Sequence, residues 1–285
     1  MIFKQEKETM AYPDRSIHSL GRLSPRDYYI IYGNLSYEVD EEHTDRELTR
    51  SEMELMYNHL SGVKTSVHLC CGAGRHVEAF GNIGILSIGI DLSPYLISTG
   101  NRKLRQLSLS EKALLAVGTA TVAPIRSQSI DCVTLLGNSF SLFDETEVEH
   151  LFVEIRRILA SFGLVILDIP CTGHVIDHFS HGLTKTSRKI KTNTLGEVDI
   201  VWTRQLDREG QKVDSLETYT FLDENDCIQV KKISFSFYLY KPEKICTIAS
   251  AAGLRLSSVM EHNDTSGRYL GMLRRRIFLI LKADA

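Results

Sequence analysis

The stretch Thr65-Ser-Val-His-Leu-Cys-Cys-Gly-Ala-Gly-Arg75 carries the pattern that decides the fold. Its short apolar run, Val67 to Cys70, ends at two glycines separated by one residue, and a helical pattern follows at once. This order predicts a strand, a tight glycine turn and a helix. At such a junction the glycines let the backbone approach a ligand, and the free N–H groups that start the helix favour anionic or acceptor atoms. The pattern therefore indicates a nucleotide-type ligand.

The next strand adds a carboxylate to this turn. A dinucleotide-binding turn would have a third glycine where this chain has Val77, so that fingerprint is incomplete. The apolar run Ile85–Asp91 ends in an acid about 20 residues after the turn, where a doubly wound sheet places its ribose ligand. Asp91 could instead cap the following helix, but Ser93-Pro94 already supplies an N-cap and a first-turn proline. We expect Asp91 to bind ribose.

Several motifs follow one another in a recognisable order. They are Val67-His-Leu-Cys-Cys-Gly-Ala-Gly-Arg-His76, Gly89-Ile-Asp-Leu-Ser-Pro94, Gly118-Thr-Ala120, Ser129-Ile-Asp-Cys-Val133 and Gly163-Leu-Val-Ile-Leu-Asp168. With these motifs the sequence resembles the S-adenosylmethionine-dependent methyltransferases of the seven-stranded Rossmann-like class, and most closely the branch that methylates small molecules. The resemblance covers most of residues 24–285, and an ordered set is far more specific than one glycine turn.

The resemblance implies S-adenosylmethionine as the cofactor. The expected cofactor-binding residues are Cys70, Cys71, Gly72, Ala73, Gly74, Asp91, Leu92, Thr119, Ala120 and Asn138. Thr119 stands where family members usually have an acid that accepts from the adenine amino group, so this contact would lack a charge. Asn138 follows a strand end, where ligands of parallel sheets lie, although an Asn after a glycine equally suits a turn.

The expected fold is α/β, a doubly wound, mostly parallel seven-stranded Rossmann-like sheet with an inserted antiparallel β cap and an N-terminal helical lid. Residues 63–170 and 241–285 would form the methyltransferase core. Alternating apolar and polar residues at 198–206, 213–222 and 227–240 interrupt the β-α pattern, so residues 171–240 are assigned to the cap. Residues 1–62 would form the lid segment.

Tyrosines are concentrated in the segment from Pro25 to Tyr37. A tyrosine joins an apolar ring to a polar hydroxyl, so these residues could cover a ligand or simply pack in the core with their hydroxyls at the surface. The resemblance favours the lid, because the small-molecule branch closes a similar helical segment over its ligands. The candidates for lining the substrate pocket are Tyr28, Tyr32, Tyr219 and Tyr240.

A group of histidines follows the fifth strand of the core, where this fold receives its substrate. Helical spacing would place His174, Asp177, His178 and His181 on one face. Three interpretations remain open: a general base or substrate contact, a metal site, and the polar face of a solvated helix. The metal interpretation is the weakest, because no second carboxylate cluster accompanies these residues. His174 and His178 are the candidate catalytic residues, and no metal is expected.

Composition limits the partners. The formal net charge of −3 provides no field for a polyanion, so nucleic acid is disfavoured as a substrate. The basic run Arg274-Arg275-Arg276 is expected to be a solvated approach to the last strand. No C-x-x-C pair occurs among the 6 cysteines, and no segment resembles a signal peptide or a membrane span, so we expect a cytoplasmic protein without membrane contact. The sequence is also compatible with a homo-oligomer.

Methyl transfer is an in-line displacement that depends mainly on holding nucleophile and methyl group together in a dehydrated pocket. The sequence therefore predicts an enzyme that methylates an N, O or C nucleophile of a small-molecule metabolite. Two alternatives remain: a regulatory protein that binds S-adenosylmethionine without catalysis, and, with less support, a nucleic-acid methyltransferase.

Overall fold

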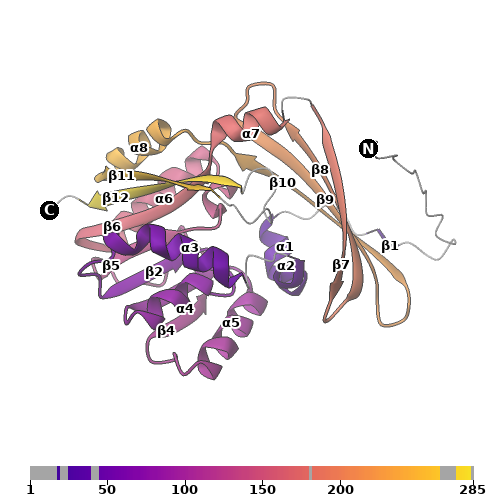
Figure 1. Ribbon diagram of the computed structural model, residues 1–285, viewed down its shortest axis with the longest axis horizontal. Helices are drawn as coiled ribbons and strands as arrows, with labels where there is room; N and C mark the ends of the chain where they lie inside the picture. The colour runs from indigo at the N-terminus through magenta and orange to yellow at the C-terminus, as the bar shows by residue number, and fades with distance from the viewer. Residues whose placement is uncertain (1–17, 20–24, 40–44, 180–181, 264–273, 284–285) are drawn as a thin grey trace.

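The computed structural model describes residues 18–19, 25–39, 45–179, 182–263 and 274–283. Two sheets face each other across the helices α1 (Pro25–Ile31) and α2 (Gly33–Val39), as Figure 1 shows. Among the described residues no helix has the length and apolar character needed to cross a bilayer.

The larger sheet has seven strands in the order β11-β12-β6-β5-β2-β3-β4. Their bounds are β2 Thr65–Leu69, β3 Leu86–Asp91, β4 Ala113–Val117, β5 Ile130–Leu135, β6 Leu159–Pro170, β11 Leu254–Asn263 and β12 Arg275–Ala283. Only β12 runs against its neighbours β6 and β11, whereas β4, β3, β2, β5 and β6 pair in parallel. The predicted fold class is confirmed, and the carboxyl ends of five strands meet at one edge.

Helices cover both faces of this sheet. One face carries α3 (Arg46–Met56), α4 (Arg75–Asn82) and α5 (Pro94–Gln106), and the other carries α6 (Glu145–Ile158) and α8 (Pro242–Ala251) (Figure 1). Local capping explains where several helices begin: the side chains of Asp45, Ser93 and Asp144 accept backbone N–H groups at the starts of α3, α5 and α6.

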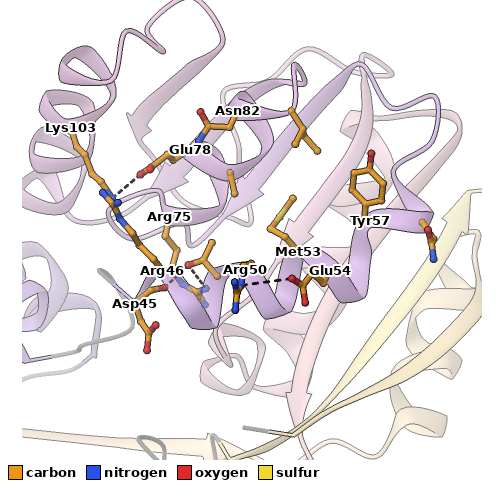
Figure 2. Close-up of a pocket in the computed structure, with 14 residues that line it drawn as sticks. Asp45, Arg46, Arg50, Met53, Glu54, Tyr57, Arg75, Glu78, Asn82 and Lys103 are labelled. Atoms are coloured by element: carbon orange, nitrogen blue, oxygen red, sulfur yellow. Dashed lines mark hydrogen bonds and ion pairs between the residues drawn. The ribbon is translucent and has the colours of Figure 1, made fainter. Parts of the chain in front are cut away.

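An open groove of about 470 Å³ runs between α3 and α4 on the outer side of the first face. Figure 2 shows charged side chains along it, with Lys103 of α5 paired to Glu78 at 2.7 Å and Arg50 to Glu54 at 3.7 Å. Arg75 lines part of the groove, although most of this residue is buried. The first of the two ion pairs joins α5 to α4 and the second lies within α3, whereas Met56 of α3 and Phe80 of α4 pack in one apolar cluster.

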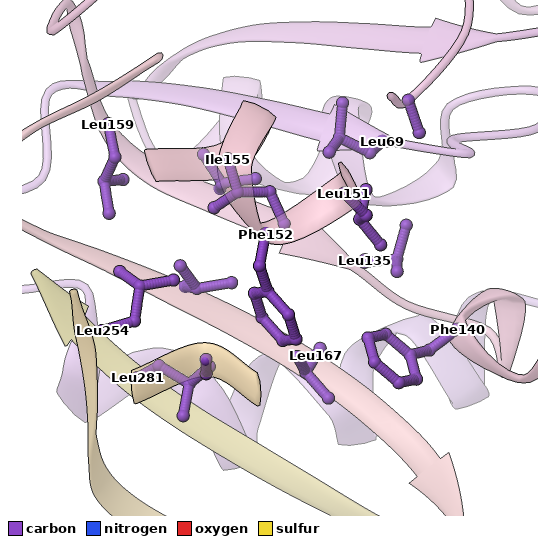
Figure 3. Close-up of a cluster of buried hydrophobic side chains, with 14 of the residues drawn as sticks. Leu69, Leu135, Phe140, Leu151, Phe152, Ile155, Leu159, Leu167, Leu254 and Leu281 are labelled. Atoms are coloured by element: carbon purple, nitrogen blue, oxygen red, sulfur yellow. The ribbon is translucent and has the colours of Figure 1, made fainter. Parts of the chain in front are cut away.

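The core divides between the two faces because alternate residues of each strand point to opposite sides. In β5 and β6, Val133 and Leu167 pack with α6 and α8, whereas Cys132 and Ile166 pack with α3 and α4. Figure 3 shows Phe152 of α6 among leucines from several strands in the first of these clusters. Continuous apolar runs are typical of parallel strands buried on both faces.

The smaller sheet is the cap, defined here as β7 (Thr184–Thr192), β8 (Gly196–Leu206), β9 (Lys212–Leu222) and β10 (Ile228–Tyr238). Its strands pair as antiparallel neighbours, and the short β1 (His18–Ser19) pairs in parallel with β10. The strands β8 to β10 lie where the alternation predicted them. The edge strand β7 was missed, because its exposed Lys185, Arg188, Lys189 and Lys191 conceal any alternation.

The segment α1–α2 lies between the cap and the large sheet. Tyr28 and Leu35 pack into an apolar cluster with Val198, Tyr219 and Ile233 of the cap. On its other side α2 contacts the start of α5, where a Cβ added to Gly33 would lie 2.1 Å from Oγ of Ser93. This helical pair therefore connects the cap to the carboxyl edge of the large sheet. The rest of the proposed lid segment includes residues 1–17, 20–24 and 40–44, which lie outside the described residues.

Candidate functional site

The glycine turn after β2 has the backbone geometry that its sequence predicted. Gly72 and Gly74 have φ angles of +55° and +82°, and Cys70 has +53°, all in the left-handed region. The N–H of Cys71 donates to the carbonyl of Ile90 at 3.1 Å, so the turn is attached to the end of β3. The backbone between Cys70 and Gly74 is thereby folded tightly ahead of the α4 N-terminus.

Asp91 lies at the end of β3 and joins this turn to the next helix. Its Oδ2 accepts from Gly72 N at 2.8 Å and its Oδ1 accepts from Ser93 N at 2.9 Å. Burial raises the pKa of Asp91, while these backbone donors favour its charged form. A carboxylate has about four acceptor positions, so further hydroxyl donors could bind beside these two N–H groups. Ser93 caps α5, as its sequence predicted, because its hydroxyl oxygen accepts from Leu96 N at 3.3 Å.

The predicted adenine loop lies next to Asp91. Gly118 N donates to the backbone carbonyl of Asp91 at 2.9 Å, and Leu92 is half-buried beside it. The Thr119 and Thr121 hydroxyls are 3.2 Å apart, so Thr119 has a local partner in this structure. Ala120 is buried in the main core. The tertiary structure thus brings Cys70–Gly74, Asp91–Leu92 and Thr119–Ala120 to one edge of the sheet.

Asn138 occupies the turn after β5 with a φ angle of +61°. Its backbone N–H donates to Oδ1 of Asp168 at 3.0 Å, and its side-chain oxygen accepts from Ser141 Oγ at 3.0 Å. The backbone of Asn138 therefore forms a turn, which is one of the two roles expected for this residue. Asn tolerates the left-handed conformation better than most residues. Asn138 is buried at the carboxyl edge, between the ends of β5 and β6.

A buried cluster of ionisable side chains lies behind this edge and was missed in the sequence analysis. Glu52 of α3 is fully buried and accepts from Arg75, His76 and Arg276. The His76 Nε2 to Glu52 Oε2 distance is 2.8 Å, and Arg276 also pairs with Asp168. We call Glu52, Arg75, His76, Asp168 and Arg276 the ionic cluster.

The charge states in the ionic cluster follow from opposing effects. Burial opposes the ionisation of Glu52, but Arg75, Arg276 and His76 outweigh it and hold its pKa well below the usual range. Burial and Arg75 lower the pKa of His76 to about 4 despite Glu52, so His76 is neutral and donates from Nε2 at neutral pH. Burial raises the pKa of Asp168 against the effect of Arg276.

The prediction for the arginine run was wrong in one part. Arg274 and Arg275 are exposed, but Arg276 is only 3% exposed and joins the ionic cluster. The sequence does contain a signal for the burial of Glu52, the partner of Arg276. Leu48, Glu52 and Met56 are spaced by four residues, which puts Glu52 on the apolar face of its helix. A carboxylate on a buried face requires charged partners.

Three of the four predicted pocket tyrosines come together. Tyr28 and Tyr219 stack with ring centroids 5.9 Å apart, and Lys231 Nζ lies 5.3 Å from the Tyr32 ring centroid. The Tyr219 hydroxyl donates to Glu217, which also pairs with Arg204 at 3.1 Å. These contacts put a carboxylate and two cations among the aromatic rings on the inner side of the cap.

Tyr240 lies elsewhere, in the main core of the large sheet. Its ring packs edge-on against Phe140 with centroids 5.3 Å apart, and its hydroxyl donates to the Phe143 carbonyl at 2.9 Å. Burial raises the pKa of Tyr240, and nearby carboxylates add to the shift. The structure therefore separates Tyr240 from the other three tyrosines and gives it a packing role.

The two candidate histidines differ in their surroundings. Both belong to α7 (Thr172–Phe179), which follows β6 and packs against the cap through Val175 and Phe179. His178 is exposed beside the Phe179 ring. The Nε2 atom of His174 is enclosed, and no residue in the described ranges forms a hydrogen bond with it. His181 lies outside those ranges.

The groove in Figure 2 does not coincide with this site. Its lining includes Arg75 but neither the glycine turn nor Asp91. The residues that could bind a nucleoside lie at the carboxyl ends of β2 and β3. The candidate site is therefore formed by the hydrogen-bonded glycine turn and Asp91, apart from the groove.

Comparisons with known proteins identify relatives of the domain that carries this site. Residues 67–163 match the family model described as methyltransferase domain. A putative methyltransferase from Geobacillus sp. (strain WCH70) is 24% identical over 143 residues, and this match spans 50% of the chain and 53% of that protein. The chain thus spans about half the length of the curated relative it matches.

Solved structures resemble almost the whole chain. A methyltransferase from Clostridium acetobutylicum, described as S-adenosylmethionine-dependent, has a TM-score of 0.66 at 17% identity, covering 89% of this chain and 99% of that one. The sugar N-methyltransferase KedS8 from a Streptoalloteichus species has a TM-score of 0.64 at 15% identity, covering 99% and 100%. At these identities the likeness establishes the fold.

The seven-stranded sheet and its glycine turn share the Rossmann-like fold of the methyltransferase structures that this chain resembles. Residues 67–163 of this chain are a methyltransferase domain, which confirms the resemblance to the S-adenosylmethionine-dependent methyltransferases seen in the sequence.

Proposed function

We propose that this protein transfers a methyl group from S-adenosylmethionine to an amine of a small molecule that carries a sugar or a sugar-like ring. The observation that carries the cofactor assignment is the bridge from Gly72 N through the Asp91 carboxylate to Ser93 N. This bridge fixes an acceptor-rich carboxylate beside a helix N-terminus, a combination that suits ribose hydroxyls and a nearby carboxylate. The amine is supported by the likeness to the sugar N-methyltransferase KedS8.

The residues of this edge fit the cofactor by their chemistry. Asp91 would accept from the ribose hydroxyls, and the N–H groups around Gly72–Gly74 would receive the methionine carboxylate at the α4 N-terminus. Leu92, Thr119 and Ala120 would border the adenine, with the Thr119 hydroxyl as acceptor. S-adenosylmethionine, when bound, supplies a sulfonium methyl group that an amine lone pair can displace in line.

The acceptor would lie between this edge, the α1–α2 segment and the inner side of the cap. Tyr28, Tyr32 and Tyr219 bring aromatic rings to that region, with Tyr32 half-buried and the other two buried. Glu217, Arg204 and Lys231 bring charge. A hydroxylated ring with an amine needs both kinds of contact. We propose residues 171–240, which contain α7 and the cap, as the segment that selects the acceptor.

An amine that arrives protonated must lose a proton before its lone pair can attack the methyl group, and His174 is the proposed acceptor of that proton. Its enclosed Nε2 has no hydrogen-bond partner among the described residues, which suits an atom that a ligand completes. His178 is exposed and is the weaker of the two candidates. A positioned base typically contributes about 10²–10⁴-fold to a rate.

The test is incubation of the purified protein with methyl-labelled S-adenosylmethionine and a panel of aminosugars, aminoglycosides and glycopeptides. The expected result is formation of S-adenosylhomocysteine together with label in one acceptor class. Matched acceptors with a hydroxyl in place of the amine serve as controls. Binding of S-adenosylmethionine without turnover on any acceptor would favour the regulatory alternative, and absence of binding would reject the proposal.

A further inference from the structure

The ionic cluster connects the glycine turn to the carboxyl ends of β5 and β6. Arg75 and His76 are the first two residues of α4, directly after Gly74. Both contact Glu52, which also contacts Arg276, and Arg276 contacts Asp168. The other oxygen of Asp168 accepts from Asn138 N at 3.0 Å. The chain of contacts thus runs from the cofactor turn to the left-handed turn after β5.

We propose that Glu52 is a positioning residue for the methionine end of the cofactor, acting through Arg75 and His76 on the start of α4. This inference rests on the proposed function, because it concerns how the same edge holds S-adenosylmethionine. Glu52 itself lies on α3 and is fully buried behind the turn, so its effect would pass through the two residues it holds.

Energetics argues against a purely stabilising role for this cluster. Taking ions out of water is costly, and apolar side chains of similar volume often stabilise a protein as well as a buried ion set does. The apolar Met56 and Phe80 already pack α3 and α4 onto the sheet beside it. What charged hydrogen bonds add is fixed geometry, because their donors and acceptors must align.

The contacts of Glu52 explain how a change at this residue would affect the proposed ligand site. Arg75 and Arg276 both donate to its carboxylate, and the Arg75 NH2 to Glu52 Oε1 distance is 3.2 Å. Loss of the negative charge would leave two buried guanidinium groups facing each other. Their repulsion would displace Arg75, and with it the first turn of α4, whose N–H groups are proposed to hold the methionine carboxylate.

The test compares Glu52→Gln with Glu54→Gln. Both residues lie on α3 and both pair with arginine, but the Glu54 side chain is 71% exposed. Affinities for S-adenosylhomocysteine and for methylthioadenosine, which shares the nucleoside and thioether but lacks the amino-acid part, are measured by calorimetry. Each variant is measured at a temperature where circular dichroism shows it fully folded.

We expect Glu52→Gln to weaken S-adenosylhomocysteine binding by about tenfold while changing methylthioadenosine binding by less than about twofold. A merely structural role would affect both ligands equally or neither. Glu52→Asp, which retains the charge, should recover part of the lost affinity. Glu54→Gln should bind both ligands as the wild type does.

The inference is overturned if folded Glu52→Gln binds S-adenosylhomocysteine like the wild type, or if both ligands weaken together. If Glu52→Gln does not fold, Glu52→Asp is judged by the same two ligands, and failure of both variants to fold makes the cluster a folding element and rejects the inference. A wild-type protein that binds neither ligand would instead reject the proposed function.

Discussion

A Cβ on Gly33 would lie 2.1 Å from Oγ of Ser93, so α2 begins in direct contact with the residue that caps α5. Ser93 is also the residue whose N–H donates to Asp91. The helical segment proposed as a lid is therefore connected to the proposed ribose ligand through a single intervening residue.

Replacing Gly33 by alanine should weaken S-adenosylmethionine binding. The added methyl group must push α2 away from Ser93. Overpacking costs about 1–3 kcal/mol, which corresponds to about 5- to 150-fold in affinity if the whole cost falls on the state that binds the cofactor. Calorimetric titration measures this effect. Gly173→Ala is the matched control, because Gly173 also lies in a helix but has no atom within 4 Å of an added Cβ. Equal affinities for both variants would contradict a lid role for α2.

Replacing Asp91 by alanine should weaken S-adenosylmethionine binding by roughly 2–3 kcal/mol, because charge-assisted hydrogen bonds to the ribose are lost. The control is Asp223→Ala in the cap, which also removes a carboxylate that accepts backbone N–H groups, from Asn225 at 2.9 Å and Cys227 at 3.0 Å. The same titration is used, and an unchanged dissociation constant for Asp91→Ala would reject the ribose assignment.

Acid should destabilise the fold through His76. Its folded pKa of about 4 lies below the ordinary value near 6.5, so the unfolded chain binds more protons between these values. The contribution of His76 to the free energy of unfolding is therefore fully present above pH 6.5. It falls by about 3 kcal/mol when the pH is lowered to 4. Denaturant unfolding of the wild type and His76→Gln across this range measures it. Since Gln does not titrate, the difference in unfolding free energy between the two proteins should shrink by that amount. A difference that stays constant with pH would show that the folded-state pKa is not lowered.

Arg276→Gln should cost about 3–5 kcal/mol of unfolding free energy, because Asp168 and Glu52 would each lose a buried charged partner. Arg274→Gln changes the same residue type two positions earlier, where the side chain is exposed, and should cost less than about 0.5 kcal/mol. Urea midpoints of the two variants provide the comparison. Similar small effects at both positions would contradict the burial of Arg276.

His174→Ala should remove the acid limb of the pH–rate profile once an acceptor is known, because a base must be unprotonated to take up the amine proton. His178→Ala should keep both the limb and most of the turnover, since that side chain is exposed. The measurement is kcat against pH for both variants. If both profiles match the wild type, positioning alone accounts for the reaction, and the catalytic assignment of His174 fails.

Much of the large sheet could be predicted from sequence because its signals are local. The apolar run Ile85–Asp91 forms β3 (Leu86–Asp91), which ends at the predicted acid, and Ser93-Pro94 caps α5 as expected. Apolar runs bounded by turns specify parallel strands wherever those strands lie in the sheet. The polar edge strand β7 has no such signal, because neither of its faces is continuously buried.

The sequence by itself determined the class of the protein, since the glycine turn, the acid after the second strand and the order of the later motifs are all readable without coordinates. Only the tertiary structure decided which charges are buried together. Glu52 and Arg276 are 224 residues apart in the chain, and the helical spacing that indicates burial of Glu52 does not indicate which partners it meets. Burial of an ion depends on partners that the fold brings into contact, so no local pattern could have predicted the ionic cluster or separated Tyr240 from the tyrosines of the cap.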